Sequence, residues 1–245
     1  MPEGREEMVA TKPKASLEIP VKPSRELLNG LIARSKKIAD IGFGQGDWIH
    51  YAKKANPKAI IHGVEAATQE DDFTGEQVKQ DQIKIPGSHL SSKGFEHWLR
   101  QPEQYDLVNI GLFLMNHRDN VLHRIHKKLE TQINLGKNPL HAKKYEEYSK
   151  KREELLRQQP PYSGPTSLEL YLGGVCPKLA DEEIVKHLKI VKEKKLGKAG
   201  VLRLVEWAVA RESVLKGLQA AGFKKIISRT IPKSEAISAR EQQAA

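Results

Sequence analysis

The sequence predicts an α/β protein built on a doubly wound, mostly parallel sheet with a helical insertion. Short apolar runs typical of buried strands alternate with amphipathic segments typical of helices along most of the chain. A glycine-rich turn directly follows the first of these runs, as it does where a strand turns sharply into a helix. The chain has 245 residues, of which 38% are hydrophobic and 29% charged, and this is enough for one large α/β core with an insertion or for two small domains.

The glycine-rich turn lies in the segment ADIGFGQGDW. Asp40 ends the apolar run, and glycine then occupies every second position, at Gly42, Gly44 and Gly46. Glycine permits positive φ angles, and its missing Cβ lets a ligand approach the backbone closely. The helix that begins near Asp47 offers unpaired N–H groups and a positive dipole end to an anionic group.

A complete βαβ unit follows from this turn. A short helix is expected over residues 49–54, and a second strand over residues 59–64 ends in Glu65. Glu65 lies 25 residues beyond Asp40, about where an acid accepts hydrogen bonds from ribose hydroxyls. The unit therefore indicates a nucleoside-bearing cofactor. Dinucleotide sites prefer G-x-G-x-x-G, whereas the third glycine of that pattern is replaced here by Asp47.

The alternation of strands and helices continues until a final pair of strands. Further strands are expected over residues 81–86, 105–111, 200–206, 224–231 and 235–240. Further helices are expected over residues 92–100, 118–129, 139–159 and 212–221, with Gly222 ending the last of them. The final two strands would form a closing antiparallel hairpin, which makes the expected sheet seven-stranded.

The pattern D-x-G-x-G-x-G followed by a distant acid resembles motif I and the acidic loop of class I S-adenosylmethionine (SAM) dependent methyltransferases. GKAGVLRLVEW is similar to the fifth strand of that family, and LQAAGFKKIISRT to its last helix and sixth strand. The resemblance covers about residues 36–130 and 180–240. IGFGQG followed by NP and GVE is similar to the start of tRNA guanine-N7 methyltransferases, but that likeness fades at LFLMNHRD. The resemblance implies the Rossmann-like methyltransferase fold and SAM as cofactor.

The resemblance also implies a set of cofactor-binding residues. Glycines would shape the pocket around the methionine moiety, Glu65 would accept from both ribose hydroxyls, and Ser88 stands where the family commonly carries an acid for the adenine amine. The full set is Asp40, Gly42, Gly44, Gly46, Glu65, Ser88, Asn109, Ile110 and Gly111.

Three residues are candidates for orienting or deprotonating the methyl acceptor. Asn116 and His117 belong to the loop expected after the fourth strand, and Glu206 ends the fifth. Each has a structural alternative: Asn116 as a helix N-cap, His117 as a solvated loop residue, and Glu206 as an ordinary acid at a strand end. No metal site is expected, because His123 and His126 share a helix face with no visible third ligand.

An insertion is expected over residues 130–179, where it would serve as a substrate cap or only stabilise the fold. Residues 118–159 hold 11 basic and 6 acidic residues, whereas residues 38–117 hold 7 basic and 11 acidic ones. This uneven charge suits a phosphate-bearing partner and favours RNA, although the interleaved Lys and Glu of residues 143–154 are also typical of a solvated helix. A small-molecule acceptor and a non-catalytic binding subunit remain the alternatives.

The composition and the apolar runs of the chain indicate where in the cell the protein is expected. No apolar run approaches the roughly 18 residues of a membrane span, so no membrane partner is expected. Residues 1–16 lack the apolar stretch of a secretory signal, and the single Cys176 excludes an internal disulfide. A cytoplasmic methyltransferase domain over residues 17–240 is therefore expected, with flexible tails at residues 1–16 and 241–245. No oligomeric state follows from the sequence.

Overall fold

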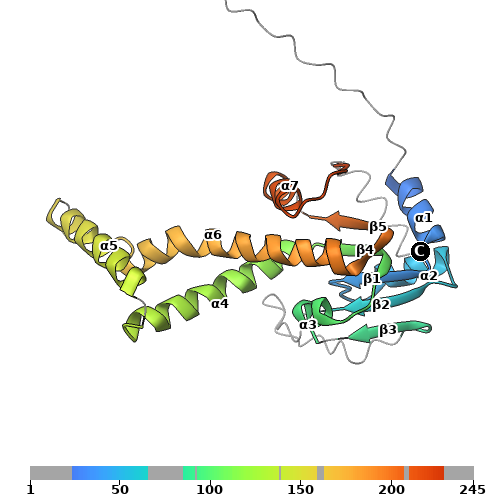
Figure 1. Ribbon diagram of the computed structural model, residues 1–245, viewed down its shortest axis with the longest axis horizontal. Coiled ribbons are helices and arrows are strands. Elements are labelled where there is room, and N and C mark those ends of the chain that lie inside the picture. Colours follow the sequence, from blue (N-terminus) through green and yellow to red (C-terminus); the bar gives the residue numbers. More distant parts are fainter. Residues whose placement is uncertain are drawn as a thin grey trace, which may run out of the picture.

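The central sheet is parallel and five-stranded. The computed structural model describes residues 24–65, 85–91, 93–137, 139–158, 163–206 and 210–228. Within these residues the strands lie in the order β3-β2-β1-β4-β5 (Figure 1), which is the order of a Rossmann-like, doubly wound sheet. The strands are β1 (Lys37–Ile41), β2 (Ile60–Val64), β3 (Ser88–Ser91), β4 (Tyr105–Gly111) and β5 (Leu196–Val205). The α/β fold with a parallel sheet is thereby confirmed.

The expected number of seven strands is not what the described residues show. Residues 224–228, the start of the expected sixth strand, form no strand, and the remainder of the closing hairpin lies outside the described residues. The expected tails at residues 1–16 and 241–245 also lie outside them. Strand β4 has the predicted bounds, because five of its seven residues are buried, on both faces of the sheet.

Alternate residues of the strands pack into two separate hydrophobic cores, one on each face of the sheet. Ile38 and Leu107 pack on one face of the sheet against α1 (Ser24–Arg34) and α2 (Asp47–Ala55). Ala39 and Val108 pack on the other face, where α3, α4, α6 and α7 lie. These four helices are α3 (Phe95–Arg100), α4 (Leu114–Asn134), α6 (Ser167–Ile190) and α7 (Arg211–Ala220). Both faces of the sheet are therefore covered, as its apolar strands require.

The third strand does not lie where the sequence predicted it. Residues 85–86 form no strand, residues 81–84 lie outside the described part, and β3 begins at Ser88, opposite Ile61 of β2. Gly87 has φ +72°, so Pro86-Gly87 forms the turn that enters the strand. Ile85 is buried, but in the turn before the strand. The prediction from DQIKIP is therefore wrong for residues 85–86, the two residues of it that the structure describes.

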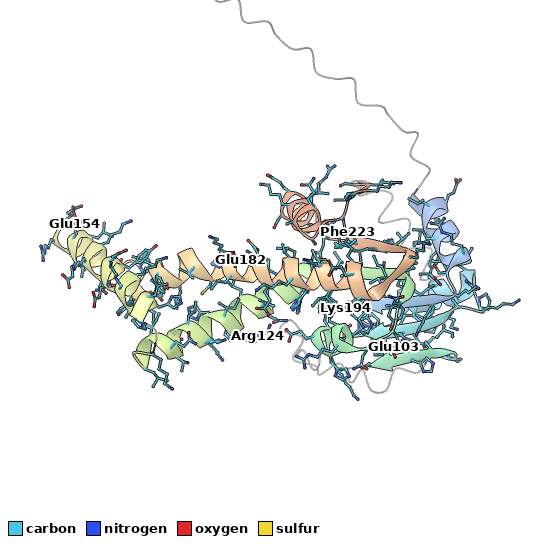
Figure 2. All side chains as sticks on the ribbon, in the orientation of Figure 1. Glu103, Arg124, Glu154, Glu182, Lys194 and Phe223 are labelled. Carbon is cyan, nitrogen blue, oxygen red and sulfur yellow. The ribbon has the colours of Figure 1, made fainter. Side chains whose placement is uncertain are left out.

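A helical arm extends from the sheet. Helices α4 and α6 pack along each other and run away from it, with α5 (Pro139–Gln158) at their far end (Figure 1). Glu154 of α5 lies near the tip of the arm, and Arg124 of α4 lies closer to the sheet (Figure 2). A separate small core built around Leu129, Tyr171, Leu172 and Cys176 holds the arm together.

The arm differs from the expected insertion in its boundaries. Helix α4 begins four residues earlier than predicted and continues to Asn134, and LELYLGGVCPKL belongs to α6. Helix α6 begins with a capping box, in which Glu169 N donates to Thr166 Oγ1 at 3.2 Å and the Glu169 carboxylate accepts from Thr166 N. It continues through Pro177 into the π-helical turn η2 (Val191–Lys195) and β5. A role of residues 130–179 as a cap stays a prediction.

Two smaller expectations concern helix ends and membrane spans. Gly222 has φ +85°, and its N–H donates to the Gln219 carbonyl at 2.9 Å, so it ends α7 as predicted. Among the described helices, none combines the length and the apolar character needed to cross a bilayer.

Candidate cofactor site

The glycine turn lies at the carboxyl end of β1, between that strand and α2. Gly42, Gly44 and Gly46 have φ angles of +76°, +53° and +89°, a region that disfavours residues with a Cβ. A Cβ added at Gly42 would lie 2.9 Å from Phe113 Cβ, so the turn packs tightly against the chain after β4 at this point. A Cβ added at Gly44 would meet no described atom within 4 Å. Within the described part of the chain, the turn therefore leaves open space above Gly44.

The predicted acid lies beside the predicted turn. Gly44 N donates to Glu65 Oε2 at 2.7 Å, and Glu65 N donates to the Ser91 carbonyl at 3.0 Å. Only 8% of Glu65 is exposed. A carboxylate accepts about four hydrogen bonds, so the bond from Gly44 is compatible with a further donor from a ligand.

A polar row crosses three neighbouring strands on the side of α1 and α2. Asn109 of β4 is paired with Asp40 of β1 and with Arg203 of β5. Arg203 Nη1 donates to Asn109 Oδ1 at 2.5 Å, and Asn109 Nδ2 donates to Asp40 Oδ1 at 2.7 Å. Asp40 Oδ2 is buried and has no hydrogen-bond partner among the described residues. Such an orphaned acceptor is costly unless a ligand or water satisfies it.

Burial dominates the electrostatics of this row. Desolvation raises the pKa of Asp40 from 3.8 to about 7, although the bond from Asn109 and the charge of Arg203 act in the opposite direction. Desolvation likewise lowers the pKa of Arg203, against the attraction of Asp40. Arg203 was missed by the sequence analysis, although a basic residue inside the apolar strand VLRLV is unusual enough to have marked it.

Other expected cofactor residues occupy different surroundings. The side chain of Ile110 packs in the core together with Ile41 and Phe95, so only its backbone faces the strand end. Gly111 ends β4 and is half-buried. Ser88 lies at the amino end of β3, where its hydroxyl donates to the Ile85 carbonyl at 2.6 Å. This position is at the opposite edge of the sheet from the glycine turn, so we leave Ser88 out of the proposed cofactor site.

Two of the candidate catalytic residues lie in the first turn of α4, not in a loop. The N-cap of this helix is Phe113, preceded by Leu112 at φ +50°. The N-cap alternative for Asn116 is thereby wrong. Asn116 is exposed, and its Nδ2 lies 3.5 Å from the Leu112 carbonyl. The loop prediction failed because nothing at residues 112–116 has the sequence of a conventional capped helix start.

Glu206 supplies the cap that the sequence of α4 lacks. Its Oε1 accepts from Leu114 N at 2.6 Å and from Met115 N at 3.3 Å. A carboxylate is stabilising at this end of a helix, where the backbone N–H groups are unpaired and the dipole is positive. The third candidate therefore holds the start of α4 at the end of β5.

His117 belongs to a cluster that the sequence did not reveal. Its Nε2 lies 3.1 Å from His187 Nδ1 of α6, and Glu96 of α3 is the third member of the cluster. Burial lowers the pKa of His117 to about 4, with a smaller contribution from His187, so its ring is neutral at physiological pH. The structure does not bring His123 and His126 into this cluster.

Comparisons with known proteins find similarity to solved structures. No protein-family model matches the chain. No curated protein is similar to it at a significant level. Three crystal structures of the plantazolicin methyltransferase BpumL, in complex with SAH and a monoazolic, pentazolic or triazolic desmethylPZN analog, are similar to it.

The similarity to BpumL is distant. Sequence identity is 13%, 14% and 15% in that order, with TM-scores of 0.30, 0.30 and 0.28. The match covers 69%, 69% and 80% of this chain and 65%, 65% and 77% of BpumL. In the first two comparisons the chain thus spans less than two thirds of the length of BpumL. These values are too low for site residues or substrates to be transferred to this chain.

Proposed function

We propose that this protein is a SAM-dependent methyltransferase. The observation that carries the proposal is the pairing of Gly44 with Glu65 beside the orphaned carboxylate oxygen of Asp40. Together they combine a bare stretch of backbone, an acid at the end of the neighbouring strand and a buried negative group at the carboxyl edge of a parallel sheet. Ligands of open α/β sheets bind at this edge.

Different residues of the site match different chemical groups of SAM. The space above Gly44 admits a ligand against the backbone, and Glu65 is placed to accept from ribose hydroxyls. Asp40 offers a buried oxygen, anionic above its pKa of about 7, to a ligand that carries positive charge. When bound, SAM supplies a methyl group activated by a sulfonium, so the protein has mainly to hold donor and acceptor close and aligned.

We assign the orientation of the acceptor to Asn116. Of the three candidate catalytic residues, it alone is exposed, at the start of α4. Glu206 already accepts from the backbone of that helix, and His117 is buried in its cluster. Asn116 carries both a donor and an acceptor on its amide, which suits orientation better than proton removal.

Replacing Glu65 with glutamine is expected to weaken SAM binding by about 10- to 150-fold, because hydrogen bonds to a charged group are worth about 1.5–3 kcal/mol. The amide still accepts from Gly44 through its oxygen, so the turn keeps its shape. Isothermal titration of SAM and of SAH measures the change. Glu182→Gln, an exposed position on α6, is the matched control. Equal affinity of the Glu65→Gln variant and the unaltered chain would remove Glu65 from the site.

RNA is the acceptor class that we propose within this function. None of the residues of α5 is buried, and its lysines at 143, 144, 150 and 151 are exposed, as is Arg157, which contacts Glu153 at 4.0 Å. Two other cations of the arm are already paired, since Arg118 contacts Asp181 at 2.6 Å and Arg124 contacts Glu183 at 3.0 Å. The candidate RNA surface is therefore α5 and not the inner part of the arm.

Counterion release makes binding to phosphates weaken steeply with salt. We expect total RNA to bind with such a salt dependence and to accept a tritiated methyl group from SAM. Charge reversal of Lys150 and Lys151 should weaken RNA binding and leave SAM binding unchanged. Label that enters a metabolite extract and not RNA would favour the small-molecule alternative. SAM binding with no acceptor in either pool would favour a non-catalytic binding subunit.

A further inference from the structure

Glu96, His117 and His187 come from three different helices and meet at one place. One ligand atom of each residue lies within 4.8 Å of those of the other two. We propose that these three side chains form a binding site for a divalent first-row transition-metal ion, with Zn²⁺ as the best match. The site does not depend on the proposed methyltransferase function.

The donor set selects the class of ion. Two imidazole nitrogens and one carboxylate oxygen are a common three-ligand set for zinc in sites that keep a further position open. The same set also binds other first-row ions, whereas Mg²⁺ and Ca²⁺ require oxygen ligands. His117 Nε2 and His187 Nδ1 are 3.1 Å apart. Two ligands about 2.0–2.1 Å from one tetrahedral ion are separated by roughly 3.3 Å, so the two rings are already near that spacing.

His117 is held in place by aromatic packing. Its ring stacks on Phe113, with ring centroids 5.4 Å apart and planes at 12°, and meets the edge of Phe95 at 5.0 Å and 78°. Only 8% of the residue is exposed. A rigid and largely dry imidazole loses little freedom when it binds an ion, and the apolar surroundings strengthen the interaction with charge.

Two carboxylates and a guanidinium lie around the cluster. Arg124 Nη2 lies 2.7 Å from Glu96 Oε1 and 3.0 Å from Glu183 Oε1, so one guanidinium faces two carboxylates. With neutral imidazoles, Arg124, Glu96 and Glu183 together carry a charge of −1. Lys186, whose charge also acts on His187, offsets it. Carboxylates that bind metals are usually hydrogen-bonded by a neighbouring side chain, and Arg124 is in position to orient Glu96 in this way.

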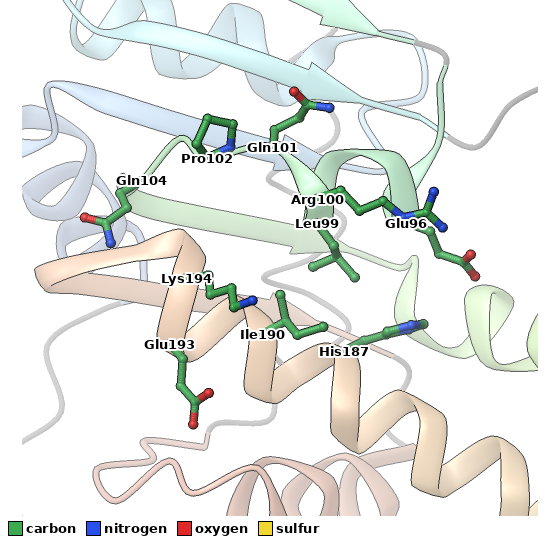
Figure 3. A pocket seen from close by; sticks show the side chains of 10 residues that line it. All are labelled: Glu96, Leu99, Arg100, Gln101, Pro102, Gln104, His187, Ile190, Glu193 and Lys194. Atoms are coloured by element: carbon green, nitrogen blue, oxygen red, sulfur yellow. The ribbon is translucent and has the colours of Figure 1, made fainter.

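A cavity opens beside the cluster. Glu96 and His187 lie at one end of a cavity of about 520 Å³ between α3 and α6 (Figure 3). Leu99, Arg100, Pro102 and Ile190 form part of its remaining wall. Because two of the three proposed ligands line this cavity, a water molecule or small anion in it has access to the ion.

The metal site and the cofactor site are separate but close. The ring of Phe113 stacks on His117, and Phe113 Cβ lies 2.9 Å from the position of a Cβ at Gly42. One side chain therefore separates the glycine turn from the cluster. Loss of SAM binding and loss of metal binding can consequently be tested with different variants of the same chain.

The test uses the full chain, stripped with a chelator and titrated with Zn²⁺ by calorimetry and with Co²⁺ by visible absorption. We expect one ion per chain, intense d–d bands typical of a tetrahedral Co²⁺ site, and a rise in Tm on adding Zn²⁺. Removing a ligand should weaken Zn²⁺ binding about 100-fold or more, given that loss of a supporting partner alone costs 10- to 100-fold.

His187→Asn and Glu96→Gln are the primary variants, because both residues are less buried than His117 and their loss threatens the fold less. His123→Asn, exposed on α4 and outside the cluster, is the control and should bind Zn²⁺ like the unaltered chain. Gly44→Val should also keep full Zn²⁺ affinity, whatever its effect on SAM. Absence of Zn²⁺ binding to the unaltered chain, or equal affinity of His187→Asn and His123→Asn, would overturn the proposal.

Discussion

Replacing Gly44 with valine is expected to abolish SAM binding while the chain stays folded. The position has φ +53°, and a Cβ there would point into open space with no described atom within 4 Å. The valine side chain would therefore collide with a ligand and with none of the described atoms of the protein. We expect the affinity for SAM to fall more than about 100-fold, since the displaced ligand loses both backbone contact and the alignment with Glu65.

The backbone strain of this substitution needs its own control. Gly136, at the end of α4, has φ +61° and likewise has no described atom within 4 Å of an added Cβ. Gly136→Val therefore carries a comparable penalty for a branched residue at positive φ, remote from the cofactor site. Both variants should show similar drops in Tm, and only Gly44→Val should lose SAM in calorimetry. Retained SAM affinity in Gly44→Val would show that the cofactor does not bind above the turn.

The parts that sequence reasoning predicted well are those specified by neighbouring residues. Glycines at every second position favour a turn, whatever the rest of the chain does. The continuous apolar run of residues 105–111 is typical of a buried strand. The unit from Asp40 to Glu65 was therefore predicted almost residue by residue. In the structure Gly44 N lies 2.7 Å from Glu65 Oε2, so the turn and the acid lie side by side.

The parts that failed depend on partners distant in sequence. The start of α4 at Leu114 cannot be read locally, because its cap comes from Glu206, more than 90 residues later. The same holds for the polar row, in which Asn109 joins Asp40 and Arg203, 69 and 94 residues away. Only the packing of β1, β4 and β5 side by side makes these contacts, and sequence spacing does not give that register.

The histidine cluster shows the same limit for a chemical site. His117 and His187 are 70 residues apart, and no spacing between them or Glu96 matches a known metal motif. The pair His123 and His126 had the recognisable spacing, yet the structure assembles a different set. The long arm is responsible, because α4 and α6 pack along each other and bring their inner ends to α3.

Replacing Asp40 with asparagine is expected to stabilise the fold at neutral and alkaline pH while weakening SAM binding. Burial raises the pKa of Asp40 in the folded chain to about 7, above its ordinary value of 3.8. Between these values the unfolded chain is ionised while the folded chain holds the proton. Stability therefore falls as pH rises through this window, and the loss reaches up to about 4 kcal/mol above pH 7. Asparagine carries no such charge and still accepts from Asn109.

Chemical denaturation of both chains between pH 5 and pH 8 measures this effect. The advantage of Asp40→Asn should grow by about 2 to 3 kcal/mol over that range, whereas Asp119→Asn, exposed on α4, should follow the unaltered chain. SAM affinity of the unaltered chain should rise with pH, because ionised Asp40 attracts a cationic ligand, and that rise should disappear in Asp40→Asn. If the two chains keep the same stability difference at every pH, the oxygen of Asp40 is satisfied in the folded protein. The buried carboxylate of Asp40 lowers the stability of the fold, so we expect its charge to serve the binding of a cationic ligand.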